Sequence, residues 1–367
     1  MNKILFLVQG EGRGHMTQAI ALAQMLPGTT IRVLVGRSPE RQIPAFFRRA
    51  FPDAEAFDSL NFTFDARHRS VNQLRTGLAA AVQIPRYWRT IRRLRAQIRA
   101  FAPDIIINFF EPIGSLACRG LGIPAVAIGH QFLFLHPATP FPPRSGLQRR
   151  GFRAYLRFFF GHCERKLALS AYAAPPHRDV VVVPPLLRTE VFMRPTRRRG
   201  YVLAYLVNRG YASDIGGWDR PTICFWDNPD GPRRVREGKV RFHQIDDRAY
   251  LRFMAQCGTL VTTAGFESMC EAAYLGKPMV LVPVEGHFEQ LCNATDAAHH
   301  GIATHATSFT GIDLSAIRPP QVDRDWLASA ARIIPPLLAG LVARACGAPG
   351  ANRKSEERAF HSFGGVS

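Results

Sequence analysis

The sequence predicts an α/β protein built from two doubly wound domains, each a mostly parallel sheet covered by helices on both faces. Three observations support this fold class. The chain has 367 residues, which suits two domains of ordinary size better than one core. Short apolar runs alternate with stretches of helical spacing. The alternation breaks off at a stretch rich in arginine and proline and then starts again.

The first domain is expected to span residues 1–185. Its strands are expected at five apolar runs: Ile4–Val8, Ile31–Val35, Ile105–Ile107, Ala125–Ile128 and Val180–Val183. These runs are short and nearly continuous in apolar residues, so both faces of the sheet should be covered. The helical stretches between them supply the covering layers.

The stretch 186–199 is expected to link the two domains. Pro184-Pro185 precede it, and "RPTRRRG" (194–200) suits a linker better than a core. The second domain, 200–320, then restarts the pattern with strands expected at 201–207, 221–226, 239–245, 259–263 and 278–284.

The remainder of the chain differs in character from both domains. Residues 321–346 are expected to form a C-terminal helical segment that Pro335-Pro336 interrupt. The polar tail, 347–367, is expected to be disordered. Asp323-Arg324-Asp325 is expected to be a solvated helix start.

Composition favours a soluble, cytoplasmic protein. Hydrophobic residues make up 47% and charged residues 20%, and no apolar run approaches the roughly 18 residues of a membrane helix. The apolar run at the start is too short for a signal peptide. The seven cysteines are scattered without a Cys-x-x-Cys pair, so we expect buried thiols rather than a disulfide framework or a zinc site.

The net charge of +19 leaves two interpretations open. Clustered basic residues attract the phosphates of nucleic acids and of anionic lipids. Arginine greatly outnumbers lysine, however, and this excess is also typical of a GC-rich genome that loads the protein surface with arginine codons.

A glycine-rich turn follows the first expected strand: "GEGRGHMTQA", residues 10–19. A dinucleotide fingerprint would have its third glycine where this chain has His15, and no acid ends the second strand. Arg37 stands there instead, which keeps an NADP-dependent dehydrogenase as a weak alternative. His15 lies where open α/β sheets place ligands and is suited to act as a general base. A helix-capping histidine is the structural alternative.

The stretch "TTAGFESMCEAAYLGKPMVLVPVEGHFEQLCNA" (262–294) predicts a nucleotide-sugar site. A helix is expected to begin at Phe266, just after Gly265, and its free amides favour a diphosphate. Glu271, one turn further on, is placed to accept hydrogen bonds from ribose hydroxyls. The later polar side chains suit the edge of a hexose: Glu289, Gln290 and Asn293.

This stretch resembles nucleotide-sugar glycosyltransferases with two facing Rossmann-like domains, the GT-B type. The group includes the lipid II N-acetylglucosaminyltransferase, the UDP-glycosyltransferases and bacterial predicted glycosyltransferases. The motif is Ala-Gly-x-x-Ser-x-x-Glu-(x)4-Gly-Lys-Pro, followed by Val-Pro, Glu-Gln and Asn-Ala. The resemblance covers roughly residues 1–135 and 200–305.

The resemblance implies a role for each matching position. It implies that Gly265 and the amides of Phe266, Glu267 and Ser268 bind the diphosphate, and that Glu271 binds the ribose. Glu289 and Gln290 are similar to the pair that reads the donor sugar, with Asn293 nearby. In "HQIDDRAY" (243–250), Ile245 corresponds to the turn that holds the base. "GEGRGH" is similar to the acceptor-side loop, with Gly12, Gly14 and the catalytic base His15.

The chain also departs from the family pattern. Many relatives have an aspartate after the fourth strand that orients the catalytic histidine, whereas this chain reads "INFFEP", with Phe109 near that place. Glu111 is the only acid nearby, so support of His15 by Glu111, by a backbone carbonyl or by nothing stays open. In "NRG" (208–210), Asn208 or Arg209 is placed to touch phosphate, and a plain turn is the alternative.

The function expected from these residues is an inverting, metal-independent transfer of a hexose-type sugar, UDP-linked by resemblance, to a hydroxyl acceptor. No cofactor is expected beyond the nucleotide-sugar co-substrate, and no specific nucleic acid. The stretch 85–101 places Ile91, Leu94, Ile98 and Phe101 on one helical face among arginines, and 151–162 adds aromatics. Both also suit a lipid-linked, cell-envelope acceptor and docking on the inner face of an anionic membrane. For 85–101, a stripe that faces the core, with the charged face in solvent, is favoured over docking. The alternatives are a nucleotide-sugar 2-epimerase on the same fold and a non-catalytic polyanion- or RNA-binding protein.

Overall fold

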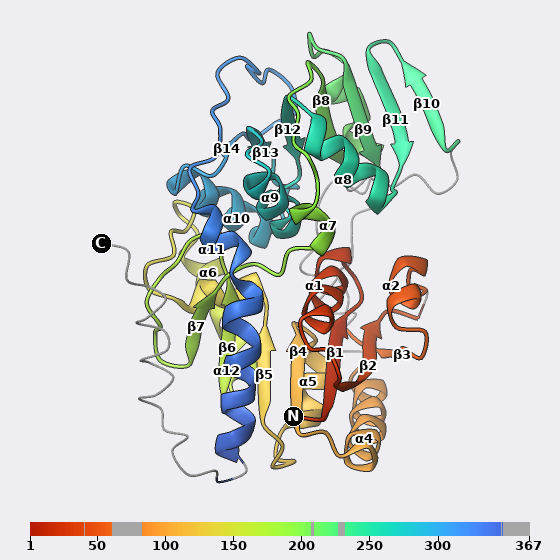
Figure 1. Ribbon diagram of the computed structural model, residues 1–367, viewed down its shortest axis with the longest axis vertical. Helices are drawn as coiled ribbons and strands as arrows, with labels where there is room; N and C mark the ends of the chain where they lie inside the picture. Colours follow the sequence, from red (N-terminus) through yellow and green to blue (C-terminus); the bar gives the residue numbers. More distant parts are fainter. Residues whose placement is uncertain (40, 61–82, 207–208, 227–231, 346, 348–367) are drawn as a thin grey trace.

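The computed structural model contains two sheets, each flanked by helices, with α1 and α9 lying where the two halves meet (Figure 1). The structure describes residues 1–39, 41–60, 83–206, 209–226, 232–345 and 347. The tail predicted to be disordered, 347–367, lies outside the described residues apart from Gly347.

The first sheet has seven parallel strands in the order β3-β2-β1-β4-β5-β6-β7. Their bounds are β1 (Lys3–Gln9), β2 (Thr30–Arg37), β3 (Glu55–Asp58), β4 (Ile105–Phe109), β5 (Ala125–Ile128), β6 (Arg165–Leu169) and β7 (Val180–Val183). The order reverses between β1 and β4, so the crossovers from these two strands leave in opposite directions. A ligand site is expected at such a switch point, beyond the carboxyl ends of the strands.

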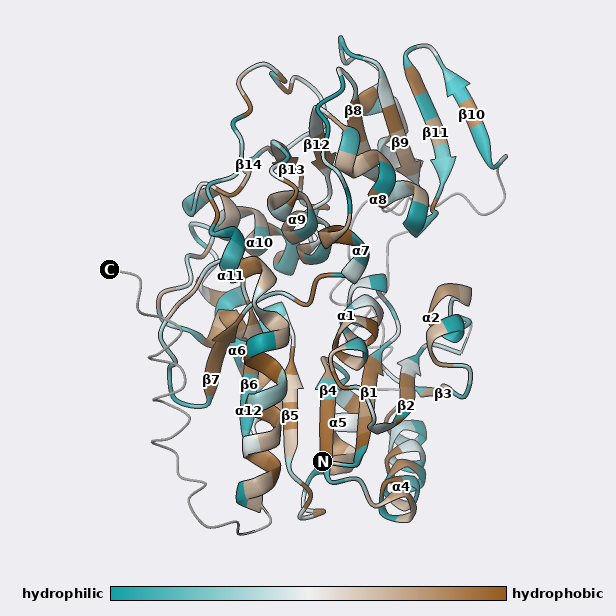
Figure 2. Ribbon diagram, viewed as in Figure 1, coloured by the Kyte–Doolittle hydropathy of each residue, from teal (hydrophilic) through white to brown (hydrophobic). Residues whose placement is uncertain are grey.

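Helices cover both faces of this sheet. Along β1, Ile4, Phe6 and Val8 belong to one apolar core and Leu5 and Leu7 to another, and all five side chains are fully buried. The first core is closed by α1 (Arg13–Gln24) and α2 (Ala45–Ala50). The second is closed by α4 (Ile84–Phe101), α5 (Pro112–Cys118), η1 (His130–Leu135) and α6 (Gly146–Phe160). Strands β1 and β4, at the centre of this sheet, are accordingly coloured as hydrophobic in Figure 2.

The second sheet has the order β10-β11-β9-β8-β12-β13-β14. Its strands are β8 (Val202–Leu206), β9 (Thr222–Trp226), β10 (Arg234–Glu237), β11 (Val240–Gln244), β12 (Thr259–Thr262), β13 (Met279–Leu281) and β14 (Thr304–His305). Only β10 pairs antiparallel, with β11, among the strand pairs of the described ranges. The switch point lies between β8 and β12. Helices η2 (Arg209–Ile215), α8 (Asp247–Gln256), α9 (Phe266–Tyr274) and α10 (Phe288–His299) follow the strands.

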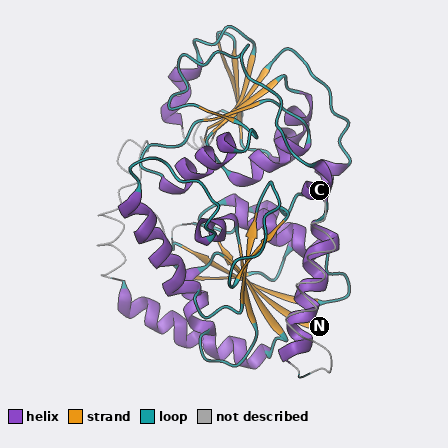
Figure 3. Cartoon of the chain, turned by 90° about the vertical axis from the view of Figure 1, so that its left-hand side faces the viewer, coloured by secondary structure: helices purple, strands orange, loops and turns teal. Residues whose placement is uncertain are grey.

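Seen from the side, helices lie on both sides of each sheet, which confirms the α/β fold class with two doubly wound sheets (Figure 3). The chain crosses between the halves twice. The first crossing carries α7 (Thr189–Phe192). The second carries α11 (Arg324–Ala328), which packs on α9, and α12 (Ala330–Ala345), which returns to lie against β7 of the first sheet (Figure 1).

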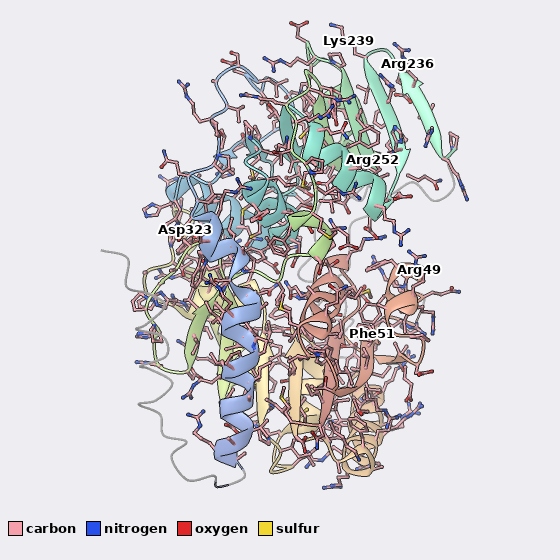
Figure 4. The ribbon with its side chains drawn as sticks, in the orientation of Figure 1. Arg49, Phe51, Arg236, Lys239, Arg252 and Asp323 are labelled. Carbon is pink, nitrogen blue, oxygen red and sulfur yellow. The ribbon has the colours of Figure 1, made fainter. Side chains whose placement is uncertain are left out.

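The C-terminal helices differ from the prediction in one respect. Pro335 and Pro336 lie inside α12 and do not interrupt it; the break falls at Ser329, between α11 and α12. The flanking Ile334 and Leu338 are completely buried. Burial of this apolar face therefore outweighs the two backbone hydrogen bonds that the prolines remove. The predicted helix start is confirmed: Asp323, labelled in Figure 4, caps α11 by accepting from the amides of Asp325 and Trp326.

Four strands were not predicted from the sequence: β3, β6, β10 and β14. The reason is clearest for β6, where Lys166 breaks the apolar run. Its side chain is only 2% exposed and its ammonium group forms an ion pair with Asp179. A buried charge that finds a partner is tolerated in a strand, and that partner is invisible in the local sequence.

The cysteines behave as predicted within the described ranges, where six are present, all buried and none in a disulfide: Cys118, Cys163, Cys224, Cys257, Cys270 and Cys292. The exposed basic residues labelled in Figure 4, Arg49, Arg236, Lys239 and Arg252, are spread over both domains. Among the residues that the structure describes, no helix has both the length and the apolar character needed to cross a bilayer.

Candidate active site

The two switch points face each other across the boundary between the domains. The glycine turn with His15 follows β1, and the turn at Gly265 follows β12. They are in direct contact, because a Cβ atom added to Gly14 would lie 2.6 Å from Glu267 Cδ. The candidate acceptor-side loop and the candidate diphosphate turn therefore form one site.

His15 lies in the first turn of α1 with both ring nitrogens facing glutamine side chains. Its Nδ1 is 3.3 Å from Gln18 Oε1, and its Nε2 is 3.4 Å from Gln131 Nε2. The ring stacks on Phe110, with centroids 5.4 Å apart. Burial lowers the pKa of His15 from 6.5 to about 4, against the smaller raising effect of the Gln18 hydrogen bond. The ring is therefore neutral near pH 7 and has a lone pair to accept a proton.

Glu111 does not support His15, which answers the question that the sequence left open. Its carboxylate is the N-cap of α5 and accepts hydrogen bonds from the amides of Ile113 and Gly114 and from the hydroxyl of Ser59. The side chain facing His15 from the end of β4 is Phe110 instead. Phe110 has a φ of 60°, an uncommon conformation for a residue other than glycine.

Gly265 is the N-cap of α9 and adds no side chain at the end of this helix. No side chain caps the helix at Gly265, and a Cβ atom there would meet only Thr263 O within 4 Å, at 3.8 Å. The amides of Phe266, Glu267 and Ser268 follow in the first turn, where helix amides lack intrahelical partners. This turn is the one that the sequence predicts to bind the diphosphate.

Two side chains of this first turn contact the first domain. Phe266 stacks on the ring of His130, with centroids 4.0 Å apart. Glu267 accepts a hydrogen bond from Gln18 Nε2. Burial raises the pKa of Glu267. Glu267 therefore joins the two domains through its carboxylate, a role that the sequence did not predict.

Glu271, the predicted ribose-binding acid, forms a bidentate ion pair with Arg188. Arg188 Nε lies 2.5 Å from Glu271 Oε1 and Nη2 lies 2.6 Å from Oε2. Both side chains are largely buried, with 3% of Glu271 and 19% of Arg188 exposed. The sequence did not predict Arg188, which comes from the crossing between the domains. The pair occupies one lone pair on each carboxylate oxygen, and no other hydrogen bond to this carboxylate comes from the part of the chain that the structure describes.

The turn predicted to hold the base lies beside this pair. Ile245 connects β11 to Asp246, the N-cap of α8, and Arg188 Nη1 is 3.5 Å from the carbonyl of the next residue, Asp247. Asp247 also forms an ion pair with Arg13 of α1. Asn208, the other predicted phosphate contact, lies outside the described residues.

The three polar residues predicted to read the sugar have different surroundings. Glu289 accepts from Gln131 Nε2 at 2.9 Å, and burial raises its pKa to about 7. Gln290 Oε1 accepts from the amide of Val284 at 2.9 Å. Asn293 is buried and donates to the carbonyl of Ala264 at 3.0 Å. Asn293 therefore braces the diphosphate turn from behind, whereas Glu289 lies on the His15 side of the site.

Three residues of the site were missed in the sequence: Gln18, Gln131 and Arg188. Gln18 had a local signal, because it follows His15 by three residues on the same helix, and residues three apart on a helix share a face. Gln131 and Arg188 had none, since their partners lie far away in the chain, at Glu289 and Glu271.

A protein-family model described as glycosyl transferase family 1 matches residues 2–316. No curated protein shows significant similarity to the chain.

Solved structures resemble the whole molecule. MurG from Acinetobacter baumannii is 14% identical, with 83% of this chain and 86% of that chain covered and a TM-score of 0.50. A UDP-glucosyltransferase from Polygonum tinctorium is 14% identical, with 99% and 97% covered and a TM-score of 0.55. UGT89C1 from Arabidopsis thaliana, complexed with UDP, is 11% identical, with 99% of both chains covered and a TM-score of 0.53. At these identities the likeness shows the fold, two Rossmann-like domains of the GT-B type.

The burial of Glu111 gives a pH-dependent prediction for stability. Burial raises its pKa from 4.5 to about 7, against the lowering effect of the Ser59, Gly114 and Ile113 hydrogen bonds. Between these values the folded chain keeps a proton that the unfolded chain has released, so this contribution to stability is lost as the pH rises through about 7. We expect the free energy of unfolding of wild type minus that of Glu111→Gln to be larger at about pH 5 than at about pH 8, measured by urea unfolding.

Glu164→Gln is the matched control, because Glu164 is an exposed acid of the same domain. The difference in free energy of unfolding between wild type and Glu164→Gln should stay nearly constant from about pH 5 to about pH 8. A difference for Glu111→Gln that is constant or grows with pH would contradict the assignment.

Proposed function

Since the chain belongs to glycosyl transferase family 1, we propose that it transfers a hexose-type sugar from a UDP-linked donor to a hydroxyl acceptor, with inversion at the anomeric carbon and without a metal ion. One observation carries the proposal. Gly14, beside the neutral imidazole of His15, abuts Glu267 in the uncapped first turn of α9. A proton acceptor and an anion-binding helix end therefore meet at the two switch points, as a displacement between acceptor and diphosphate requires.

In the proposed reaction, His15 is the general base. Its Nε2 takes the proton of the acceptor hydroxyl while that oxygen forms a bond to the anomeric carbon. The bond from the anomeric carbon to the phosphate oxygen breaks, and its electron pair leaves with the nucleoside diphosphate. Attack on the face opposite the leaving group inverts the configuration.

The leaving diphosphate is stabilised by the positive end of α9. The amides of Phe266, Glu267 and Ser268 donate to phosphate oxygens, and the helix dipole adds a partial positive charge there. These donors are fixed before the reaction, so they need no reorganisation as charge develops. We propose that they serve in place of a divalent cation.

Glu271 and Arg188 together form the proposed ribose site. The ribose hydroxyls would donate to the carboxylate lone pairs that the bidentate pair leaves unused. Arg188 holds the carboxylate in one orientation and compensates its buried charge. The backbone at Ile245, beside this pair, is proposed to receive the base.

We propose that the acceptor is lipid-linked and that α4 and α6 present a membrane-docking face. On α4 the core-facing interpretation of the stripe is confirmed, since Ile91, Leu94 and Ile98 are buried. The start of the helix is exposed, however, with Ile84 at 51% and Trp88 at 60%.

On α6, Leu147, Gly151, Ala154 and Phe158 form an exposed stripe at helical spacing, and Leu147 is 85% and Phe158 59% exposed. Both helices pack on α5 and so lie on the same side of the first sheet. Exposed arginines accompany the apolar residues: Arg89, Arg92, Arg93, Arg149, Arg150 and Arg157. Apolar side chains beside basic ones favour docking on anionic lipid.

The donor class is tested by ligand-dependent stability. UDP and UDP-hexoses should raise the unfolding temperature of the wild type, also with excess EDTA, more than GDP- or dTDP-sugars do. Glu271→Gln should weaken UDP binding about 10- to 100-fold in calorimetry, because a charge-assisted pair of hydrogen bonds is worth about 1.5–3 kcal/mol. Glu237→Gln, an exposed acid on β10, should bind UDP as the wild type does. Equal UDP affinity in Glu271→Gln would refute the ribose site.

The base is tested by His15→Ala. Loss of a general base should lower kcat about 10²- to 10⁴-fold, while UDP affinity changes by less than about twofold because the nucleotide site lies on the other domain. His299→Ala removes an exposed histidine at the end of α10 and should retain activity. Unchanged transfer by His15→Ala would remove His15 from the mechanism. Conversion of the donor sugar without any acceptor would favour the 2-epimerase.

The docking face is tested by flotation with vesicles. Wild type should float with vesicles of phosphatidylglycerol and phosphatidylcholine at low salt, and less with phosphatidylcholine alone. The double variant Trp88→Glu with Phe158→Glu should lose most of the bound fraction, because it places acids at the membrane surface. Met193→Glu is the control, since Met193 is 77% exposed but lies outside α4 and α6. Equal flotation of the two variants would refute the docking face.

A further inference from the structure

Two glutamine amides connect His15 to two carboxylates of the second domain. On one side, Gln18 lies between His15 Nδ1 and Glu267. On the other, Gln131 lies between His15 Nε2 and Glu289. Both glutamines are buried, with 1% of Gln18 and 4% of Gln131 exposed. The chain of hydrogen bonds runs from α9 through α1 and η1 to α10, and so crosses between the domains twice.

The chemistry of the amide fixes the direction of the first branch. Gln18 donates from its Nε2 to Glu267 Oε1, so the amide turns its NH₂ group to the carboxylate. Its carbonyl oxygen then faces His15, and a carbonyl oxygen only accepts. The proton of the neutral ring is therefore on Nδ1.

The second branch leads independently to the same tautomer. Gln131 turns its NH₂ to the carboxylate of Glu289, at 2.9 Å, and the same NH₂ lies 3.4 Å from His15 Nε2. A ring nitrogen that faces an amide donor has to present its lone pair. Nε2 is therefore the unprotonated nitrogen.

We propose that Gln18 and Gln131 are positioning residues for His15. Each glutamine amide is oriented by a carboxylate of the second domain, and the two amides contact opposite nitrogens of the His15 ring. Together they hold the ring proton on Nδ1 and leave the lone pair on Nε2. Gln18 thereby takes the place of the missing acid after β4. The tautomer follows from the hydrogen bonds alone, while its catalytic meaning rests on the function proposed above.

In this arrangement, the tautomer of His15 depends on contact between the two domains. Gln18 and His15 are neighbours on α1 whether or not the domains touch, but only Glu267 decides which end of the Gln18 amide faces the ring. With Glu267 withdrawn, the amide can turn over and present NH₂ to Nδ1. The ring would then be free to carry its proton on Nε2, where it cannot act as a base.

The contact from Gln131 Nε2 to His15 Nε2 is long, at 3.4 Å, so a substrate hydroxyl could replace it. A hydroxyl that donates to His15 Nε2 would displace the long contact from Gln131, whose bond to Glu289 can persist. Gln131 therefore holds the lone pair of His15 in place until the acceptor arrives.

The test reads the tautomer directly. Full-length protein labelled with ¹⁵N-histidine is examined by long-range ¹H–¹⁵N correlation at about pH 8, above the pKa of about 7 of Glu289, and His15 is assigned from the signals absent in His15→Gln. The wild type should carry its proton on Nδ1. Gln18→Leu should lose this preference, and Gln18→Glu, which restores an acceptor for the Nδ1 proton, should regain it. Gln18→Met serves as a second apolar replacement if the leucine variant does not fold.

Kinetics give a second readout. Gln18→Leu should lower kcat about 10- to 100-fold with little change in the KM of the donor, as is typical for loss of an orienting partner. Gln24→Leu, the same change at an exposed position of α1, should behave as the wild type does.

A proton on Nε2 in the wild type, or an unchanged tautomer in the apolar Gln18 variants, would overturn the proposal. Absence of transfer by the wild type with any donor would instead refute the proposed function, while the tautomer measurement would still decide the role of Gln18.

Discussion

The site depends on the close approach of two helix ends, the first turns of α1 and α9. Both are N-terminal ends with partial positive charge, so placing them against each other is unfavourable unless negative charge lies between them. Glu267 supplies that charge, because its carboxylate lies against Gly14 and accepts from Gln18. The absence of a side chain at Gly14 makes the short distance feasible.

How much of this was predictable from the sequence depends on the range of each interaction. The strand–turn–helix units around His15 and Gly265 were evident, because periodicity and glycine placement are local properties. Glu111 was identified as a residue of interest, but its N-cap role in α5 became clear only in the fold. Arg188 gave no local signal at all, since an arginine in a basic linker is ordinary until its partner Glu271 is known.

The basic composition has a similar lesson. A net charge of +19 was equally compatible with a polyanion partner and with the arginine codon usage of a GC-rich genome. In the fold, some arginines stabilise the boundary between the domains, as Arg13 does with Asp247 and Arg188 with Glu271. Others lie beside exposed apolar residues on α4 and α6. Net charge adds up all arginines regardless of their role, so it cannot distinguish those at the domain boundary from those on α4 and α6.

The return of α12 to the first domain restricts how the molecule moves. Because the polypeptide passes between the halves at α7 and again before α12, the domains have two covalent pivots. The two crossings define a line, and rotation of one domain about that line is the easiest relative motion. Movement of the domains directly away from each other is opposed, because the chain connects them at both crossings. Such a rotation would open one side of the boundary like a book, and re-closing it would bring the same residues back into register.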